Sequence, residues 1–350
     1  MEPAKLNNRT VNSVVKQHLV FGAGLIGGFM AGSFASKGLS VTVVGRESMR
    51  ERFNSDLTLT DYLDHRATVS GIKFVASGEQ SKQQYDFIWL TVKCTSLAQA
   101  LLDLTPFVST NTVILSCQNG LGSDVQVKAA FPNNEVRRVI MISNVAQPNN
   151  SHLHRGSQGG LLIGAYSMGD GSTLADLVST DLLVAQNIKD MEAYSWAKLQ
   201  LNLGNAVNAL AGVPVKKMLE SRSLRKIIAL SMRELLTIAN AKQLVLPKLA
   251  AVPMRMVPTV LNTPDFLFSM LGSKMMDIDP TVRTSMWWDL HNQRLSEVDN
   301  LNGAVVSEGK KLAIDCPVNQ KIVESIHSAE SNFGEPLEPF CADEFLSDLS

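Results

Sequence analysis

Hydrophobic and polar positions change their spacing near residue 190, and this change divides the chain into two parts. In the first part, short apolar and β-branched runs alternate with segments of helical spacing, which is the pattern of an open α/β sheet. These segments predict strands at 18–21, 41–44, 86–92, 112–116 and 136–142, and helices at 25–37 and 97–104.

Two polar stretches interrupt this alternation. Leu57 to Thr60 alternates apolar and polar residues, and with Ser70-Gly71 it predicts a strand and a hairpin near residue 70. The stretch from Gln147 to Gly160 is rich in Gly, Asn and Ser, which predicts a loop.

The second part has almost no β-branched alternation and predicts helices at 196–210, 223–243, 283–293 and 297–312. Pro253, Pro258 and Pro264 predict irregular structure between residues 250 and 270, because proline interrupts a helix. After Asn332 the chain is acidic and rich in turn residues, so we expect it to be loosely held.

Composition and charge exclude several classes of protein. Of the 350 residues, 45% are hydrophobic and 19% are charged, which fits folded domains with sizeable cores and excludes a disordered chain. Lys plus Arg number 32 against 33 Asp plus Glu, and there is no long basic run. This balance argues against nucleic acid or an anionic membrane as the main partner.

The cysteines and histidines predict neither a disulfide frame nor a metal site. The four cysteines show no C-x-x-C spacing, which is typical of reduced thiols in a cytoplasmic protein. His152 and His154 lie in a polar stretch without nearby Cys or acidic ligands, so we predict no metal there.

One segment imitates a targeting signal. Residues 19–36 carry no charge and follow Lys5, Arg9 and Lys16, as in a signal peptide or a marginal membrane span. Glycines at 22, 24, 27, 28 and 32 disfavour a spanning helix, because each costs about 1 kcal/mol relative to Ala in a helix interior. We therefore expect a strand, a tight turn and a helix here, and a mature chain that begins near Met1.

This turn has the G-x-G-x-x-G pattern, at Gly22-Ala23-Gly24-Leu25-Ile26-Gly27. Between a strand and a helix, the glycines allow a tight turn, the approach of a pyrophosphate and close helix–strand packing. The pattern predicts an α/β N-terminal Rossmann-type dinucleotide-binding domain at 1–188, followed by an all-α C-terminal domain at 189–335 and an acidic tail at 336–350. A glycine-rich packing turn without a ligand is the alternative.

The end of the second strand bears on the choice of cofactor. A basic residue there accommodates the 2′-phosphate of NADP, whereas an acidic residue binds the ribose 2′-hydroxyl of NAD. Arg46 comes first after the strand and predicts NADP (NADPH), with Ser48 and Arg50 as further phosphate ligands. Glu47 follows directly, and it keeps NAD as the alternative.

Two further candidates follow predicted strands of the same sheet. Lys93 lies just past the strand at 86–92, and Asn119 lies in the Gln118-Asn119-Gly120 turn after the strand at 112–116. Ligands of open α/β sheets bind at the carboxyl ends of parallel strands. Both residues are therefore candidates for cofactor contacts, although each is also an ordinary polar loop residue.

A polar stripe marks the first helix of the second part. Lys198, Asn202 and Asn205 stand at i, i+4 and i+7, and the positions around them are apolar. Burying these side chains without partners costs several kcal/mol, and a polar ligand would supply partners. A buried lysine with a lowered pKa can act as a general acid. The alternative is a lysine that reaches solvent beside structural asparagines.

Further along, Ser296 predicts the N-cap of a new helix, with Glu297 in its first turn. Glu297 then has a structural reading as a helix-dipole residue, and Ser285 has one as a helix hydroxyl.

The motifs taken together resemble the ketopantoate reductase family. The resemblance rests on GAGLIG at 22–27, Arg46, TVK at 91–93, QNG at 118–120, KLQLN at 198–202, SM at 285–286 and SEVDNLNG at 296–303, and it spans residues 18 to 330. It implies reduction of 2-dehydropantoate to pantoate by NADPH, in a cleft between a Rossmann-type and a helical domain.

The resemblance also implies roles for individual residues. Lys198 would be the catalytic proton donor and bind the substrate, together with Asn202, Asn205, Ser285 and Glu297. The cofactor would contact the glycine-rich turn, Arg46, Lys93, Asn119, Glu297 and, through its backbone, Ala146.

The chain departs from the family pattern at several places. Ala206 stands where the family commonly has a second asparagine, and Ser96 where it often has glutamine. The tract at 250–280 is longer than in compact members. These departures leave two alternatives open: reduction of a different 2-keto acid or an opine-type imine, and a non-catalytic NADPH-sensing protein. The expected partner is a small-molecule 2-keto acid, with a homodimer left open.

Overall fold

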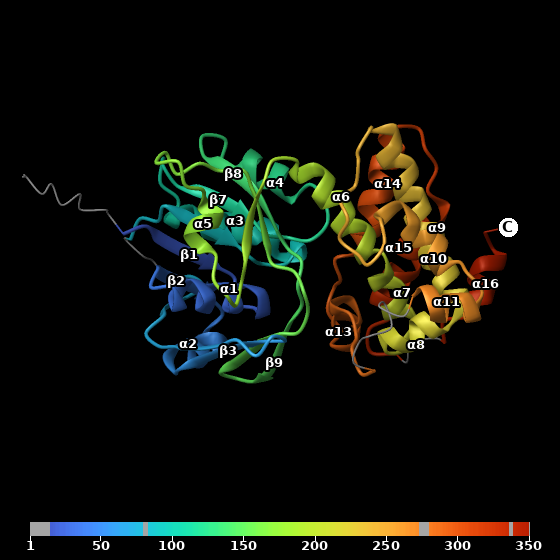
Figure 1. Cartoon of the computed structure of the whole chain (residues 1–350), viewed down its shortest axis with the longest axis horizontal. Helices are drawn as coiled ribbons and strands as arrows, with labels where there is room; N and C mark the ends of the chain where they lie inside the picture. The colour runs from blue at the N-terminus through green and yellow to red at the C-terminus, as the bar shows by residue number, and fades with distance from the viewer. Residues whose placement is uncertain (1–14, 80–82, 273–279, 336–338, 350) are drawn as a thin grey trace, which may run out of the picture.

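The computed structural model describes residues 15–79, 83–272, 280–335 and 339–349. A sheet domain and a helical domain lie side by side, and helix α6 (Met191–Asn202) leads from the first into the second (Figure 1). The last strand of the sheet domain ends at Ile188, and two residues separate it from α6.

An eight-stranded sheet with the order β12-β11-β8-β7-β6-β1-β2-β5 forms the centre of the first domain. Neighbouring strands are parallel except β8 and β11. The chain runs outward from β1 to β5 and then returns to β6 on the other side of β1, so the strand order reverses between β1 and β6. The strands are β1 (Gln17–Phe21), β2 (Ser40–Gly45), β5 (Lys73–Ala76), β6 (Phe87–Leu90), β7 (Val113–Ser116), β8 (Glu135–Met141), β11 (Leu161–Gly164) and β12 (Ala185–Ile188).

Helices cover both faces of this sheet, as the alternation of strands and helices predicted. On one face α1 (Leu25–Ser36) and α5 (Leu174–Val178) bury their apolar side chains in one core cluster. On the other face α3 (Leu97–Leu104) and α4 (Ser123–Ala130) build a second cluster. Short helical segments follow β2 and β6, namely η1 (Glu47–Met49) with α2 (Arg50–Asn54) and η2 (Cys94–Ser96), and η3 (Thr105–Phe107) follows α3.

A second sheet, in the order β4-β3-β10-β9, packs against α1 and corrects two predictions. The stretch after Gln147, predicted as a loop, forms the antiparallel strands β9 (Val145–Asn149) and β10 (His152–Arg155). The predicted hairpin at Ser70-Gly71 is also wrong. The hairpin joins β3 (Leu57–Asp61) to β4 (Arg66–Val69), and residues 70–72 cross into the main sheet.

The second domain is helical, as predicted, and it packs around α9 (Arg222–Ala241). The helix predicted at 196–210 is interrupted at Leu203, whose N–H is shared between the carbonyls of Leu199 and Gln200, so the last turn of α6 tightens. The other helical segments are α7 (Gly204–Ala211), α8 (Val215–Glu220), η4 (Met254–Met256), α10 (Val257–Leu261), α11 (Asp265–Leu271), α13 (Ser285–His291), η5 (Val298–Asn300), α14 (Asn302–Lys311), α15 (Pro317–Ser331) and α16 (Ala342–Ser347).

The described part of the acidic tail is held against this domain, contrary to the prediction that it is loose. Phe345 of α16 is buried, and Lys321 of α15 donates to Asp348 at 2.6 Å. Ser223 also donates to Asp343 at 2.6 Å, and Leu346 and Leu349 pack against the same core, so several contacts dock this short helix.

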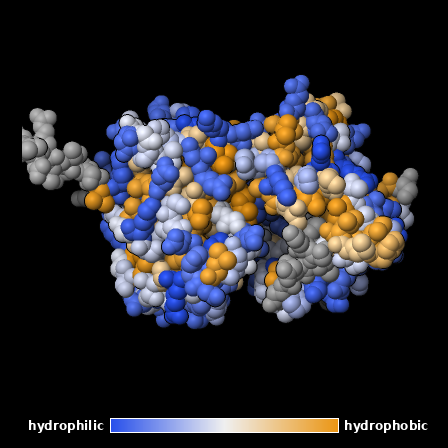
Figure 2. Space-filling view, viewed as in Figure 1, coloured by the Kyte–Doolittle hydropathy of each residue, from blue (hydrophilic) through white to orange (hydrophobic). Residues whose placement is uncertain are grey.

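The surface between the domains is notched, and apolar side chains gather mainly on the helical domain (Figure 2). Within the described ranges, none of the helices has the length and apolar character needed to cross a bilayer. The segment 19–36 forms β1, the glycine-rich turn and α1, as predicted.

Candidate active site

The glycine-rich turn connects β1 to α1 and has the geometry of a phosphate cradle. Gly22 has φ +121°, and a Cβ on Gly27 would lie 2.0 Å from the Gly22 carbonyl oxygen, so both positions require glycine. A Cβ built on Gly24 meets nothing within 4 Å, so the middle of the turn is open to a ligand.

The first turn of α1 presents free backbone donors to that space. Gly24 is the N-cap, no side chain caps the helix, and its first turn has no acidic residue. Two side chains hold the turn: half-buried Thr91 Oγ1 donates to the Gly22 carbonyl at 2.8 Å, and buried Arg52 Nη1 donates to the Ala23 carbonyl at 3.2 Å. A diphosphate fits this arrangement, because helix N-terminal N–H groups and their dipole favour an anion.

Arg46 leaves the sheet directly after β2, beside this turn. A Cβ on the preceding Gly45 would lie 2.3 Å from Ala23 Cβ, so β2 and the turn are in close contact. Arg46 is exposed, and it forms no ion pair among the described residues. Glu47 instead accepts from Arg50 Nε at 2.6 Å, and Arg50 also reaches Glu79 at 2.9 Å. The free charge at the strand end is therefore positive, while Arg50 is engaged with two acids.

The carboxyl ends of β6 and β7 meet the helical domain. Lys93 Nζ donates to Asp289 Oδ1 of α13. The next residue, Cys94, donates its backbone N–H to Glu297 Oε1 at 2.9 Å and its thiol to the Asn119 carbonyl at 3.3 Å. Lys93, Asn119 and Glu297 are thus assembled around one loop.

The turn after β7 also touches the helical domain directly. Gly120 has φ +76°, and a Cβ there would lie 1.9 Å from the carbonyl oxygen of Asn300. The next residue, Leu121, donates its N–H to the same carbonyl at 3.4 Å. Only glycine fits at position 120 while the two domains keep this contact.

Lys198 lies where these elements converge. It lines a cavity of about 10 Å³ together with Ser195 of α6 and with residues of β8 and of the turn after β7: Cys117, Gln118, Asn119, Gly120, Arg138, Ile140 and Met141. Within the described part of the chain, its Nζ has no hydrogen-bond or ion-pair partner. Burial lowers the pKa of its ammonium to about 8, so Lys198 can both hold and release a proton near neutral pH.

The rest of the polar stripe continues along α6 and α7. Asn202 is buried at the end of α6, and Asn205 is half-buried in α7 beyond the break at Leu203. Neither side chain has a hydrogen-bond partner among the residues described. The polar atoms of Lys198, Asn202 and Asn205 are not among the fully buried ones, so this unpartnered stripe is open to a polar ligand.

Ser285 begins α13, which packs against α7. Thr284 is the N-cap and donates its hydroxyl to the Asn205 carbonyl at 3.3 Å, which places Ser285 beside the polar stripe. Asp289 lies one turn further along α13 and binds Lys93, so this face of the helix is directed at the sheet domain.

Two predictions of local structure around the site need adjustment. The helix predicted from Glu297 begins later: Ser296 Oγ accepts from Val298 N at the short turn η5, and α14 starts only at Asn302. Glu297 is buried and accepts a hydrogen bond from the Cys94 backbone, so its role is not the predicted one of a helix-dipole residue.

Ala146, the predicted backbone contact of the cofactor, is exposed on β9. The side chain of the next residue, Gln147, accepts a hydrogen bond from Arg52 at 2.7 Å.

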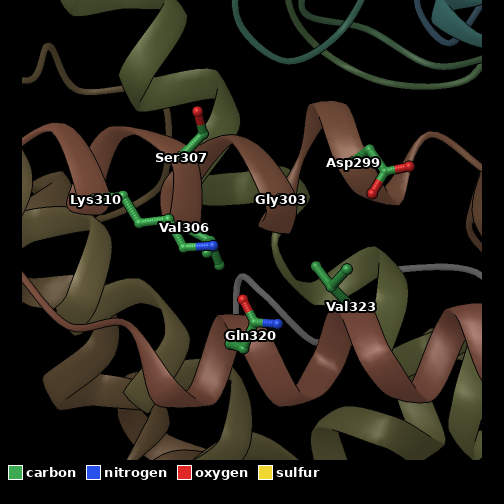
Figure 3. Close-up of a pocket in the computed structure, with 7 residues that line it drawn as sticks. All are labelled: Asp299, Gly303, Val306, Ser307, Lys310, Gln320 and Val323. Atoms are coloured by element: carbon green, nitrogen blue, oxygen red, sulfur yellow. The ribbon is translucent and has the colours of Figure 1, made fainter.

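A second cavity, of about 250 Å³, lies between α14 and α15, where Lys310 and Gln320 point toward one another (Figure 3). None of the residues predicted to bind cofactor or substrate lines it. Although it is the larger of the two cavities, we therefore do not assign the active site to it.

Sequence analysis missed two charged residues of the site. Asp289 stands four residues after Ser285 on a predicted helix, so the spacing could have shown that they share a face. Arg138 is a charged residue within the apolar run of the strand predicted at 136–142, which is itself a signal that it has specific partners.

Comparisons with known proteins identify the family of this chain. Residues 18–168 match the family model of ketopantoate reductase PanE/ApbA, and residues 190–330 match that of its C-terminal domain. A 2-dehydropantoate 2-reductase of Streptococcus pyogenes serotype M6 is 24% identical over 326 residues, which is 83% of this chain and 98% of that protein.

Solved structures share the fold at low identity. A PanE/ApbA family ketopantoate reductase from Ralstonia eutropha JMP134 matches 91% of this chain and 100% of its own, with a TM-score of 0.73 and 22% identity. A D-mandelate dehydrogenase with NADH and anilino(oxo)acetate matches the same shares of both chains, with a TM-score of 0.73 and 19% identity. The chain belongs to the ketopantoate reductase family of NAD(P)H-dependent oxidoreductases.

Proposed function

We propose that this protein uses NADPH to reduce 2-dehydropantoate to pantoate, with Lys198 as the proton donor. The observation that carries the proposal is the unpartnered polar stripe of Lys198, Asn202 and Asn205. Lys198 lies against the turn of Asn119, at the sheet edge where the cofactor of an open α/β fold binds.

The chemistry required of the protein is modest. NADPH supplies the hydride to the carbonyl carbon of the 2-keto acid when it is bound. The developing alkoxide then takes a proton from Lys198 Nζ, which leaves a secondary alcohol and a neutral amine. The pKa of about 8 suits this step, because the ammonium is populated at neutral pH and gives up its proton readily.

The remaining residues bind and orient in this proposal. Asn202, Asn205 and Ser285 supply donors for the hydroxyl and carboxylate of the substrate. Glu297 lies against the Lys93–Cys94 loop, where it would meet substrate and nicotinamide ribose. Arg46 selects NADPH, since its charge is free and that of Glu47 is balanced by Arg50.

A different 2-keto acid is the second candidate substrate, and two observations favour it. Ala206 is fully buried where the family commonly carries an asparagine. Trp287 and Trp288 pack edge to face on α13, and Trp288 is 52% exposed three residues after Ser285. The fold shared with a D-mandelate dehydrogenase makes phenylglyoxylate a reasonable second substrate.

The test is the rate of NADPH oxidation with 2-dehydropantoate, phenylglyoxylate and a panel of other 2-keto acids and imines. Lys198→Ala should lower kcat by about 10²–10⁴, the range for a positioned general acid. Lys217→Ala is the control, because Lys217 is exposed and, among the residues that the structure describes, forms an ion pair with Glu220 alone. Turnover of another substrate alone would replace 2-dehydropantoate, whereas tight NADPH binding without any turnover would indicate an NADPH sensor.

A further inference from the structure

Strand β8 carries two adjacent arginines in different environments. Arg137 is half-buried and pairs with Glu135 on its own strand. Arg138 is only 8% exposed and turns toward α6 and the turn after β7, where it lines the cavity of Lys198. A buried guanidinium is costly unless acceptors surround it, so the partners of Arg138 show what it is for.

Those partners belong to one short segment. Nη2 donates to the carbonyl of Gln118 at 2.9 Å and to the carbonyl of Gly120. Nη1 donates to Ser123 Oγ at 2.6 Å and reaches Asp124 Oδ1 at 3.5 Å. The planar fork of one side chain thus fixes the backbone on both sides of Asn119 and the start of α4.

The fixed segment is the one on which the two domains meet. Asn119 accepts from the Cys94 thiol, whose backbone N–H binds Glu297. Gly120 lies against the carbonyl of Asn300, at a distance that leaves no room for a side chain. A displacement of this turn would therefore move one wall of the Lys198 cavity and separate the domain contact.

We propose that Arg138 is a positioning residue of the site: it holds the 118–120 turn in the shape that faces Lys198 and receives Asn300. This inference rests on the proposed reductase function for its kinetic consequence. Its structural consequence, an ordered turn, does not depend on any substrate.

Hydrogen exchange tests the structural consequence without turnover. In Arg138→Met, amides of residues 118–126 should exchange about tenfold faster or more than in the wild type, and those of 297–301 should follow, because local opening sets exchange rates. Arg137→Met is the matched control and should leave both segments unchanged. Arg138→Lys keeps the charge but not the fork, so it should resemble Arg138→Met.

Steady-state kinetics test the consequence for activity. We expect kcat/KM for the keto acid to fall about 10–100-fold in Arg138→Met, and more than the affinity for NADPH, because the phosphates bind at the glycine-rich turn and only the Asn119 contact belongs to the 118–120 turn. Millimolar guanidinium should restore part of the activity of Arg138→Ala, because the free ion can take the place of the missing side-chain group. No such rescue is expected if the substitution disrupts the packing of the domain.

The outcomes separate the two proposals. Unchanged exchange at 118–126 in Arg138→Lys and Arg138→Met would overturn the role of Arg138, whatever the activity. If the Arg138 variants fail to fold, Ser123→Ala removes one acceptor, and unchanged exchange there would also overturn the role. A wild-type protein without turnover on any 2-keto acid would overturn the reductase function, while the exchange result would still decide the role of Arg138.

Discussion

Lys93 at the end of β6 and Asp289 on α13 form an ion pair that joins the two domains. Asp289 is 4% exposed, and burial raises the pKa of its carboxyl. Both lysines predicted near the reaction centre are therefore present, but only Lys198 has an ammonium without a partner. Among the described residues, this difference favours Lys198 over Lys93 as the proton donor.

The ion pair predicts that Lys93 positions the site and that Lys198 supplies the proton. Under saturating substrates, Lys93→Ala should keep kcat within about tenfold of the wild type, whereas Lys198→Ala should lose about 10²–10⁴. Asp289→Asn, which keeps the shape but removes the charge of the partner, should resemble Lys93→Ala. A larger loss of kcat in Lys93→Ala than in Lys198→Ala would reverse the assignment.

The pKa of Lys198 predicts the pH dependence of the reaction. Reduction requires the ammonium form, which is lost as the pH rises through about 8. With saturating NADPH and keto acid, kcat should be flat near pH 6–7 and fall about tenfold for each pH unit above 8, and the reverse oxidation should rise over the same range. Lys198→Arg should remove this limb, because arginine keeps its proton. An unchanged limb in that variant would assign the titration to another group.

The free charge of Arg46 predicts a preference for NADPH. Arg46→Ala should raise KM for NADPH by about ten- to a hundredfold, since a charge-assisted bond to a phosphate contributes about 1.5–3 kcal/mol. KM for NADH should change little. Arg50→Ala is the control, because Arg50 is engaged with Glu47 and Glu79. Equal effects of Arg46→Ala on the KM for both cofactors would mean that Arg46 does not bind the 2′-phosphate, and would favour Glu47 as a ligand of the ribose.

The sequence predicted those parts of the fold whose residues carry their own signal. The strands at β1, β2, β6 and β7 follow from apolar runs, and α3 has the predicted bounds because its helical spacing is clear. The site residues at strand ends could also be predicted, because the strands themselves were recognisable and the carboxyl ends of parallel strands meet at one edge of the sheet.

Other features depend on contacts between segments that are distant in sequence. The polar residues of β10 form a strand because they pair with β3, more than 80 residues earlier. No helix was predicted for α15, whose first N–H groups, at Val318 and Asn319, are capped by Glu234 of α9. The ion pair of Lys93 with Asp289 likewise spans 196 positions. Local patterns contain none of these partners.

A buried histidine predicts how the stability of the sheet domain depends on pH. His18 on β1 is fully buried, accepts from Trp89 Nε1 at 3.1 Å, and has a pKa lowered by burial to about 4. The unfolded chain therefore binds this proton first, so stability is complete above about pH 6.5 and falls toward pH 4.

His18→Asn keeps an acceptor for Trp89 but does not titrate. Between pH 7.5 and 5 the wild type should lose about 2 kcal/mol more unfolding free energy than this variant, as measured by urea unfolding at each pH. Each protein's unfolding free energy is compared between the two pH values, so a pH-independent loss of packing in the variant does not affect the result. Parallel pH profiles for the two proteins would contradict a neutral His18.

Two glycines of one turn allow the domain contact to be tested with a matched pair. Gly120 and Gly122 both have left-handed backbones, with φ +76° and +85°, so alanine at either should cost about 1–2 kcal/mol of stability. Only at Gly120 would the new Cβ strike the Asn300 carbonyl, at 1.9 Å, whereas at Gly122 it meets nothing within 4 Å.

Gly120→Ala should therefore push Asn300 away and open the wall of the Lys198 cavity, while Gly122→Ala leaves that contact intact. We expect kcat/KM for the keto acid to fall about tenfold or more in Gly120→Ala relative to Gly122→Ala. Gly122→Ala controls for the cost of the left-handed backbone, which the two variants share. Equal activity of the two variants would mean that the contact between Gly120 and Asn300 does not help to assemble the site, and that the left-handed turn alone is what position 120 requires.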